Sequence, residues 1–456
     1  MWDDLERWTD PWEMLRPLAS TKPRAGVLTA GDDNRGMSPR ALLLSRFRSA
    51  IAAVEPAAAV RSALMLRGDW LQCGHWRHQL RGRIVVIGAG KASAPMAQAV
   101  EELLGNRIER GCVVVKYGHA ADLARVRLLE AGHPVPDAAG EIATREIERA
   151  VHGLAAHDLV ICCLSGGASA LLPAPRPPLT LGDKQETTRK LLAAGVDIHA
   201  VNTVRKHLSR LKGGRLALAC APAAVLTLAI SDVSDDDLAV IGSGPTAPDP
   251  STDADAMAII RKCLPLDAIP PAVLAALAKP EPWTPKPGDH RLERVHHQIV
   301  ASNRLALAVA ARDAVLAEPL HGEARLAAER FCLHASRLPP GTCLAAGGET
   351  TVTLGEAPGL GGRNQEFALA CARWIMAHDA PLTVLAASTD GSDGPTDAAG
   401  AVVDGMTWER ALAAGFDPHA ALNSHDAYQL LRATGDLLIT GPTRTNVMDL
   451  ALAWRS

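Results

Sequence analysis

The chain has 456 residues, 48% of them hydrophobic and 21% charged, and a formal net charge of -3 at pH 7. This length is typical of about two to three domains, and the small net charge gives no electrostatic case for binding nucleic acid or an anionic membrane. No apolar run approaches the roughly 20 residues of a membrane-spanning helix, and the acidic start Trp2-Asp3-Asp4 is unlike a signal peptide. Several of the nine cysteines lie in apolar runs, which indicates free thiols, so we expect a cytoplasmic protein.

The first 36 residues differ in character from the rest of the chain. Three tryptophans fall within the first twelve positions, and a run rich in glycine, aspartate and arginine follows without periodicity. We expect a poorly ordered extension over 1–36, or a misplaced start. An amphipathic helix is predicted directly after it, over 41–54.

The remainder alternates short apolar runs with helical patterns, which predicts two α/β domains with a cleft between them. The first domain, 37–290, is expected to be Rossmann-like with a mostly parallel sheet. A proline-rich span over 265–287 marks the change of domain, and the second domain covers 291–456. The predicted strands are 84–87, 112–115, 126–129, 159–164 and 224–230 in the first half, and 297–301, 343–346, 382–387 and 437–440 in the second.

The segment Arg83–Leu104 predicts a strand, a glycine turn and a helix in succession. Ile84–Ile87 has the pattern of a buried strand, Gly88 and Gly90 form the turn, and Lys91 falls in the first turn of the helix. A cation is unfavourable there, because the exposed N–H groups already carry partial positive charge. An anion between the lysine and these N–H groups would explain it, so the pattern indicates a phosphate site. The alternative is a tight turn whose lysine points to solvent.

Two familiar nucleotide motifs do not fit this turn. A Walker loop requires glycine at the position of Val85. A dinucleotide fingerprint requires glycine at Ser93 and an acidic residue after the next strand, where Lys116 stands. The sequence therefore argues against a dehydrogenase.

Two later strands of the first domain also end in residues suited to an anionic ligand. Ser165, Gly166 and Gly167 follow the fourth predicted strand, and their consecutive N–H groups could form an anion nest, with an N-cap by Ser165 as the alternative. Asp232 follows the fifth strand, where an acid is well placed for Mg²⁺ or proton transfer, and helix capping is the competing explanation. Ligands of α/β sheets bind at this carboxyl edge.

A further helix is predicted over 202–211. Its apolar residues recur on one side, and four polar residues share the opposite face: Asn202, Arg205, Ser209 and Lys212. We expect that polar face to be solvated.

The second half carries another cation at a glycine-rich helix start. Arg363 follows a glycine-rich run as Lys91 does, and Glu349 follows the strand 343–346. Asp390 and Asp393 lie on a glycine loop that suits Mg²⁺, and the distal glutamate of a calcium loop is missing. Cations for phosphate oxygens, with acids for Mg²⁺ and for the nucleophile's proton, are what phosphoryl transfer requires.

With these segments in view, the chain from about Met37 onward resembles the glycerate 2-kinase family whose C-terminal half is called the MOFRL domain. The resemblance depends on a series of blocks in the right order: IGAGKAS at 87–93, GHPVPD at 132–137, LSGGASALL at 164–172, NTVRKHLSRLKGG at 202–214, SDVSDDDLAVIGSGPT at 231–246, GGETTVT at 347–353, GGRNQE at 361–366, STDGSDGPTDAAG at 388–400 and GPTRTN at 441–446.

The resemblance implies a kinase that uses ATP and Mg²⁺ to phosphorylate D-glycerate at its 2-hydroxyl, giving 2-phosphoglycerate. It also implies a MOFRL-type α/β fold for the second domain. The family's functional positions fall on Lys91, Arg363, Asp232, Glu349, Asp390 and Asn446. We assign phosphate and transition-state charge to the two cations, with a substrate-carboxylate clamp as the alternative for Arg363. Which acid is the base and which binds Mg²⁺ stays open, and so does the oligomeric state, a homodimer being one option.

The sequence departs from the family pattern beside the late asparagine. Arg444 stands where the family has glycine, and Met448 stands where it has asparagine. Two other functions remain as alternatives: hydroxypyruvate reductase, a label the family has also carried, and a non-catalytic sensor of sugar acids or sugar phosphates. A sensor would need the cations but would have no use for Asp232, Glu349 and Asp390 together.

Overall fold

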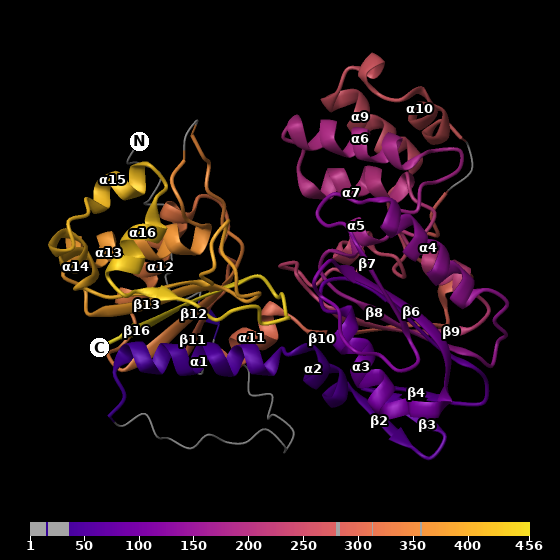
Figure 1. Cartoon of the computed structure of the whole chain (residues 1–456), viewed down its shortest axis with the longest axis horizontal. Coiled ribbons are helices and arrows are strands. Elements are labelled where there is room, and N and C mark those ends of the chain that lie inside the picture. The colour runs from indigo at the N-terminus through magenta and orange to yellow at the C-terminus, as the bar shows by residue number, and fades with distance from the viewer. Residues whose placement is uncertain (1–14, 17–35, 280–282, 312, 356–357) are drawn as a thin grey trace. The chain divides into compact units, whose positions relative to one another are not determined.

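The computed structural model describes residues 15–16, 36–279, 283–311, 313–355 and 358–456. The chain forms two compact units (Figure 1): Pro56–Ala301, called here the N-terminal unit, and Met1–Glu55 with Ser302–Ser456, called the C-terminal unit. Apart from residues 15–16 and Gly36, the predicted extension over 1–36 lies outside the described residues.

The N-terminal unit is built on a parallel six-stranded sheet with the order β10-β9-β8-β5-β6-β7. Every residue of the central strands β5, β8 and β9 is buried, as their continuous apolar runs require. The sequence predicted this parallel sheet, and the structure confirms it. The strands are β5 (Ile84–Ala89), β6 (Ile108–Lys116), β7 (Arg127–Ala131), β8 (Leu159–Leu164), β9 (Ala224–Ile230) and β10 (Val295–Ala301).

Strand β10 was predicted to open the second domain, and that prediction was wrong. It lies at the edge of the first sheet, parallel to β9, with Val295 opposite Val225. Most of its side chains are only half-buried, as an edge position allows. The proline-rich span is therefore a connection that returns to the same sheet.

The N-terminal unit also contains a group of helices that pack around a hydrophobic core of their own (Figure 1). Its members are α6 (Leu181–Ala193), α7 (Ile198–His207), α9 (Asp253–Cys263) and α10 (Pro271–Leu277). The other elements are α2 (Pro56–Ala63), α3 (Ser93–Leu104), α4 (Ala138–Val151), α5 (Ala168–Leu171), α8 (Arg215–Cys220) and a small antiparallel sheet of β2 (Leu64–Arg67), β3 (Trp70–Cys73) and β4 (Trp76–Gln79).

The C-terminal unit contains a mixed seven-stranded sheet with the order β1-β11-β12-β16-β13-β14-β15. Strand β16, which the sequence analysis did not predict, lies antiparallel between β12 and β13. The strands are β1 (Leu15–Arg16), β11 (Ala314–Leu316), β12 (Thr342–Gly348), β13 (Leu382–Ser388), β14 (Gly400–Val403), β15 (Leu437–Leu438) and β16 (Asp449–Arg455). The helices are α1 (Pro39–Ala53), α11 (Asn303–Ala310), α12 (Ala324–Ser336), α13 (Arg363–His378), α14 (Thr407–Ala413), α15 (Pro418–Asn423) and α16 (Ala427–Ala433).

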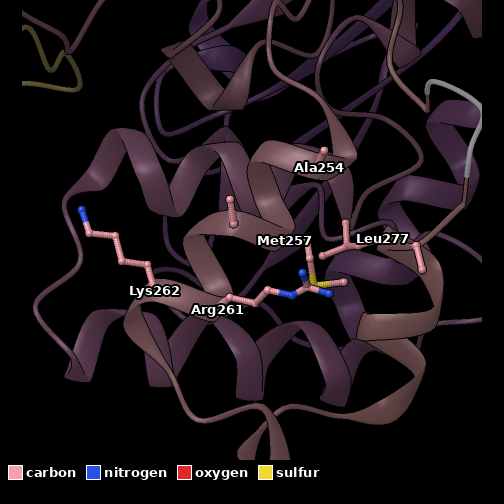
Figure 2. A pocket seen from close by; sticks show the side chains of 7 residues that line it. Ala254, Met257, Arg261, Lys262 and Leu277 are labelled. Atoms are coloured by element: carbon pink, nitrogen blue, oxygen red, sulfur yellow. The ribbon is translucent and has the colours of Figure 1, made fainter.

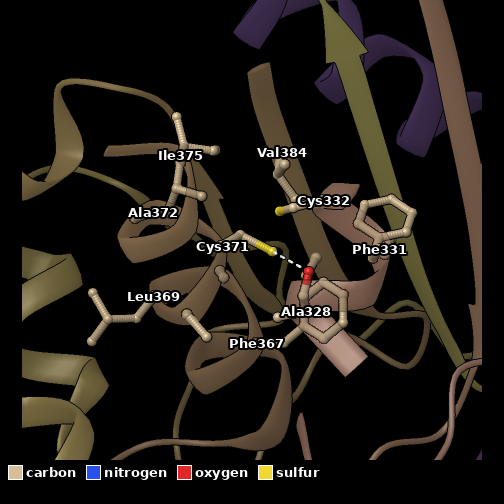
Figure 3. Close-up of a cluster of buried hydrophobic side chains, with 14 of the residues drawn as sticks. Ala328, Phe331, Cys332, Phe367, Leu369, Cys371, Ala372, Ile375 and Val384 are labelled. Carbon is tan, nitrogen blue, oxygen red and sulfur yellow. Dashed lines mark hydrogen bonds between the residues drawn. The ribbon is translucent and has the colours of Figure 1, made fainter. Parts of the chain in front are cut away.

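The core of the C-terminal unit centres on α12 and α13 (Figure 3). The rings of Phe331 and Phe367 pack against each other with centroids 5.7 Å apart. The thiol of Cys371 lies 4.0 Å from the carbonyl oxygen of Ala328 on the neighbouring helix. Small residues along α13 allow this close packing, which fixes the helix that begins at Arg363.

Helix α1 belongs to the C-terminal unit, although the sequence grouped it with the first domain. Leu43 and Phe47 on its apolar face are buried. Arg40 donates hydrogen bonds to the carbonyl oxygens of Val402 and Gly435 and to the buried carboxylate of Asp436. These contacts hold the first turn of α1 to residues 402–436 of the same unit.

All nine cysteines are free thiols, and all but Cys263 are buried, as the apolar runs predicted. Among the described residues, no helix combines the length and apolar character needed to cross a membrane.

Candidate functional site

The glycine turns after β5 and β8 interlock at the carboxyl end of the parallel sheet. The backbone N–H of Lys91 donates to the carbonyl oxygen of Gly166 at 2.9 Å, and the hydroxyl of Ser165 accepts from the N–H of Ala92 at 3.0 Å. A Cβ at Gly90 would lie 2.1 Å from the Ser165 hydroxyl oxygen, and Gly90 has a φ of 137°. Only glycine fits this close approach.

Ser165 therefore supports the neighbouring turn and does not cap its own helix. The N-cap of α5 is Gly167, and no side chain caps it. Lys91 lies just before α3, not in its first turn as predicted, because the helix begins at Ser93. The Ser93 hydroxyl donates to the carbonyl oxygen of Cys163 at 2.9 Å, which ties α3 to β8.

Three polar side chains from other segments lie against the turn of Gly166 and Gly167. A Cβ at Gly166 would lie 2.3 Å from Asp232 Oδ2. A Cβ at Gly167 would lie 3.0 Å from His133 Cδ2 and 3.5 Å from Lys91 Cγ. The structure thus brings together the predicted lysine and the predicted acid, and adds a histidine beside them.

His133 is a site residue that sequence reasoning missed. It lies in the block GHPVPD, which carried no assigned role. Burial, together with the nearby charges of Lys91, Lys116 and His119, lowers the pKa of His133 to about 4. The imidazole is therefore neutral near pH 7 and can offer one N–H donor and one acceptor nitrogen without adding charge.

In the C-terminal unit, Arg363 begins α13 and is held by two carboxylates. Its Nε and Nη2 lie 2.6 and 3.0 Å from the oxygens of Asp449, and its Nη1 lies 2.5 Å from Glu349 Oε1. Burial lowers the pKa of Arg363, but the hydrogen bond and charge of Asp449, with the charges of Glu349 and Asp393, outweigh it and raise the pKa. The guanidinium is charged and fixed in orientation.

Asp449 is the second site residue that the sequence analysis missed. It begins β16, opposite Gly348 on β12 and Ser388 on β13, so it lies where those two strands end. Its side chain is only 4% exposed, although the five residues that follow it in the strand are apolar. A lone acid at the start of an apolar strand was the available signal. Asn303 secures the same place, since its Nδ2 donates to the carbonyl oxygen of Asp449 at 3.0 Å.

The two acids of the predicted magnesium loop have different surroundings. Asp393 is buried, and its two oxygens accept the N–H groups of Asn364 and Gln365 at 3.1 and 2.9 Å, so it caps α13. Burial raises its pKa to about 6 despite these hydrogen bonds. Asp390 is half-buried, and its Oδ1 accepts from the hydroxyl of Ser388 and the N–H of Ser392 at 2.9 and 3.0 Å.

Asn446 lies on a loop that is tied to the end of β13. Its Oδ1 accepts the N–H of Met448 at 3.2 Å. Thr389 donates its hydroxyl to the carbonyl oxygen of Met448 at 2.6 Å and accepts the N–H of Val447 at 2.9 Å. Asn446 and Asp390 thus lie on connected loops of the same unit.

No group of three or more His, Cys, Asp or Glu side chains gathers as a metal site within the described residues. Magnesium in kinases is held by one or two carboxylates together with substrate phosphates. Asp232 in one unit and Asp390 in the other carry the hard oxygen donors that this ion prefers, so each fits such a role.

A groove of about 610 Å³ lies on α9 and α10, and none of the residues that line it belongs to the glycine turns (Figure 2). Met257, Arg261 and Leu277 lie together in it, and Lys262 points away. Its lining contains no acid, hydroxyl or histidine. The groove therefore lacks the carboxylate that phosphoryl transfer needs to accept a proton.

The chain matches known families and solved structures over most of its length. Residues 42–278 match the family described as Domain of unknown function (DUF4147), and residues 342–449 match the MOFRL family. A protein of Agrobacterium vitis with the provisional name hydroxypyruvate reductase is 43% identical over 430 residues, which cover 91% of this chain and 94% of the relative.

Two further relatives carry the name of a kinase. The D-glycerate 2-kinase of Thermotoga maritima is 39% identical over 379 residues, covering 81% of this chain and 90% of that protein. The crystal structure of a glycerate kinase from Thermotoga maritima has a TM-score of 0.80 and 35% identity, covering 91% of this chain and 99% of the other. The chain therefore belongs to the glycerate 2-kinase family of the MOFRL type.

Proposed function

We propose that this protein is a glycerate 2-kinase, which transfers the terminal phosphoryl group of ATP to the 2-hydroxyl of D-glycerate. The observation that supports this most is the interlocked glycine turn, where Gly166 and Gly167 lie between Asp232 and Lys91. A cation for phosphate oxygens and a carboxylate for the attacking hydroxyl are the groups that phosphoryl transfer needs. The kinase names of the relatives agree with this chemistry.

In the N-terminal unit, Gly88, Gly90 and Ser165 shape the interlocked turns, and phosphate oxygens approach the backbone N–H groups of Gly166 and Gly167. Lys91 supplies the positive charge. Asp232 takes the proton of the 2-hydroxyl as it attacks the phosphorus. His133 stays neutral and orients a ligand oxygen by a hydrogen bond.

In the C-terminal unit, Arg363 stabilises the negative charge that develops on the transferred phosphoryl group. Asp449 and Glu349 position the guanidinium through the contacts described above. Asn446 contacts the nucleotide. Asp393 was predicted as a magnesium ligand, and we propose instead that it fixes the start of α13, because both of its oxygens accept helix N–H groups.

Magnesium completes the proposal. Asp390, on the loop predicted for magnesium, would hold the ion together with phosphate oxygens of ATP, and the ion would neutralise charge on those oxygens. The side chains of this protein would then orient the nucleotide, position the hydroxyl and accept its proton.

The test is ADP release from Mg·ATP with D-glycerate, compared with the same mixture without glycerate. A kinase releases ADP only when glycerate is present, whereas a sugar-acid sensor gives equal rates in both mixtures. Identification of the product as 2-phosphoglycerate, and not 3-phosphoglycerate, checks which hydroxyl reacts.

The relative named as a hydroxypyruvate reductase makes oxidation of NADH by hydroxypyruvate the second assay. The structure gives no support to that activity at the β5 turn. Ser93, where a dinucleotide site needs glycine, is buried and bonded to Cys163. We expect no NADH oxidation, and a rate comparable to that of the kinase assay would overturn the proposal.

A further inference from the structure

The polar face predicted on the helix 202–211 is not solvated in the structure. Helix α7 ends at His207, and the residues beyond it turn inward, so that Ser209 and Lys212 are buried. Asn202 is 7% exposed, and Arg205 is half-buried. Burying polar side chains costs free energy unless they have partners, so this face serves more than solubility.

Hydrogen bonds connect this face to the segment that follows the glycine turn. Asn202 Oδ1 accepts the hydroxyl of Ser243 at 3.3 Å, and Ser243 in turn shares a hydrogen bond of 2.9 Å with Ser169. Ser169 comes two residues after Gly167, next to which His133 and Lys91 lie. The buried face of α7 therefore borders the site proposed for phosphoryl transfer.

Three cations lie near one another at this place, and one of them, Lys184, feels the charge of Glu141. Arg205 lies 3.4 Å from Asn202 Oδ1, Lys212 donates to the carbonyl oxygens of Ser169 and Leu172 at 2.8 and 3.0 Å, and Lys184 donates to that of Pro173. Within the part of the chain that the structure describes, no Asp or Glu forms a hydrogen bond or ion pair with any of the three cations. Burial lowers the pKa of each cation, that of Lys184 to about 7.

Other arginines of comparable burial are neutralised by acids. Arg210, in the same segment, contacts both oxygens of Glu148 at 2.6 and 2.9 Å. Arg363, the alternative carboxylate clamp, already holds two carboxylates. Uncompensated positive charge in a partly buried place is costly, and a bound anion removes that cost. Arg205 has guanidinium donors left for such an anion.

We propose that Arg205, with Asn202 and Ser169 beside it, binds the carboxylate of the 2-hydroxy acid substrate. The inference rests on the proposed function and names the residue that makes the enzyme select an acid. A planar guanidinium matches a planar carboxylate in a paired arrangement, while the glycine turns and Lys91 serve phosphate. The groups that bind the carboxylate and the groups that react then lie beside the same segment, residues 166–169.

The experiment compares the Michaelis constants of Arg205→Gln and the wild-type enzyme for D-glycerate and for ATP. Loss of a charge-assisted contact should raise the KM for glycerate by about 30-fold and leave the KM for ATP within about twofold. Arg205→Lys keeps the charge but lacks the paired N–H groups of the guanidinium. Its KM for glycerate should therefore lie between those of the wild type and Arg205→Gln. Arg210→Gln is the matched control, and we expect it to leave the KM for glycerate within about twofold, because Glu148 neutralises Arg210.

The other possible results of this experiment would contradict the inference, each in a different way. A raised KM for ATP with an unchanged KM for glycerate would assign Arg205 to the nucleotide phosphates and overturn the inference. Equal losses for both substrates, together with a lowered melting temperature, would make Arg205 structural. If Arg205→Gln does not fold, Arg205→Lys decides by the same split between the two constants. A wild-type enzyme without glycerate-dependent ADP release would overturn the proposed function itself.

Discussion

Backbone hydrogen bonds fix the position of Lys91 beside the second glycine turn. The N–H of Lys91 donates to the carbonyl oxygen of Gly166, and the adjoining N–H of Ala92 donates to the hydroxyl of Ser165, so the protein's own groups hold the backbone of the loop. Such preorganisation is what allows a point charge to favour a transition state, since no energy is spent on reorientation.

We predict that Lys91→Ala lowers kcat by about 10²- to 10³-fold, the loss seen when one stabilising donor is removed. The melting temperature should change little, because the backbone contacts of the loop remain. Lys262→Ala, on the exposed groove of α9, is the control and should keep wild-type turnover. Near-normal turnover of Lys91→Ala would remove the central assignment of the mechanism.

His133 makes stability depend on pH in a defined window. Because its folded pKa is about 4, against an ordinary value of 6.5, the unfolded chain takes up a proton first as the pH falls. Wild type should therefore lose stability relative to His133→Gln between pH 6.5 and about 4, and the difference should be constant above pH 6.5. Urea midpoints measured across this range check the prediction, and a wild type that gains stability relative to His133→Gln as the pH falls would contradict it.

Residue types at the ends of apolar runs were enough to predict Lys91, Asp232 and the glycine turns. The sequence could not show His133 or Asp449 as site residues, because both depend on contacts between distant segments. It also misjudged the polar face of α7, since the buried positions of Ser209 and Lys212 depend on the early end of that helix.

At the scale of elements, β16 explains how the C-terminal site is held. This strand pairs with both β12 and β13, and its first residue fixes Arg363 at the start of α13. Asp449→Asn should loosen the arginine and lower kcat about 10-fold or more. The double variant with Arg363→Ala should be no worse than Arg363→Ala alone, because Asp449 acts through that residue. Additive losses would show an independent role.

The loop before β16 carries strain at two residues. Arg444 and Met448 have φ values of 65° and 67°, in the left-handed region that side chains other than those of glycine and asparagine avoid. These are the two positions where the sequence departs from the family pattern. Arg444→Gly should stabilise the protein by about 1 kcal/mol, measured as a rise in melting temperature. Arg444→Ala removes the charge but keeps Cβ, and should give no such gain.

Strand prediction succeeded where residues are buried on both faces, as in β8 and β9, whose predicted bounds agree with the structure. It failed for β16 because Asp449 and Arg455 at its ends shorten the apolar signal. The bounds of α7 were also missed, since the residues after His207 keep the helical pattern without forming the helix.

At the scale of the molecule, the C-terminal unit is assembled from two separate parts of the sequence. Helix α1 packs against α11, β13 and β16, and the guanidinium of Arg46 lies 5.8 Å from the ring centroid of Trp454. The sequence placed the domain boundary by composition alone, which cannot show where a helix will pack. The two α/β sheets themselves were predictable from the alternation of elements.

Phe47→Ala tests this assembly. Phe47 is 1% exposed on α1, so its truncation should destabilise the C-terminal unit by about 3–5 kcal/mol. Amide hydrogen exchange should show faster exchange in β13 and α13, with β5 and β8 unchanged. Met96→Ala on α3, also buried, should give the opposite pattern. Faster exchange in β5 after Phe47→Ala would mean that the helix supports the other unit.

The divided C-terminal unit also has a consequence for synthesis on the ribosome. Residues 56–301 are contiguous and can fold as soon as they emerge, at translation speeds of about 5–20 residues per second. Helix α1 emerges earlier, but its partners β13 and β16 are synthesised near the end. The apolar face of α1 therefore cannot pack against these strands until translation is nearly complete. The carboxylate that aligns Arg363 arrives only with β16, so the nascent chain acquires its phosphoryl-transfer chemistry in a single late step.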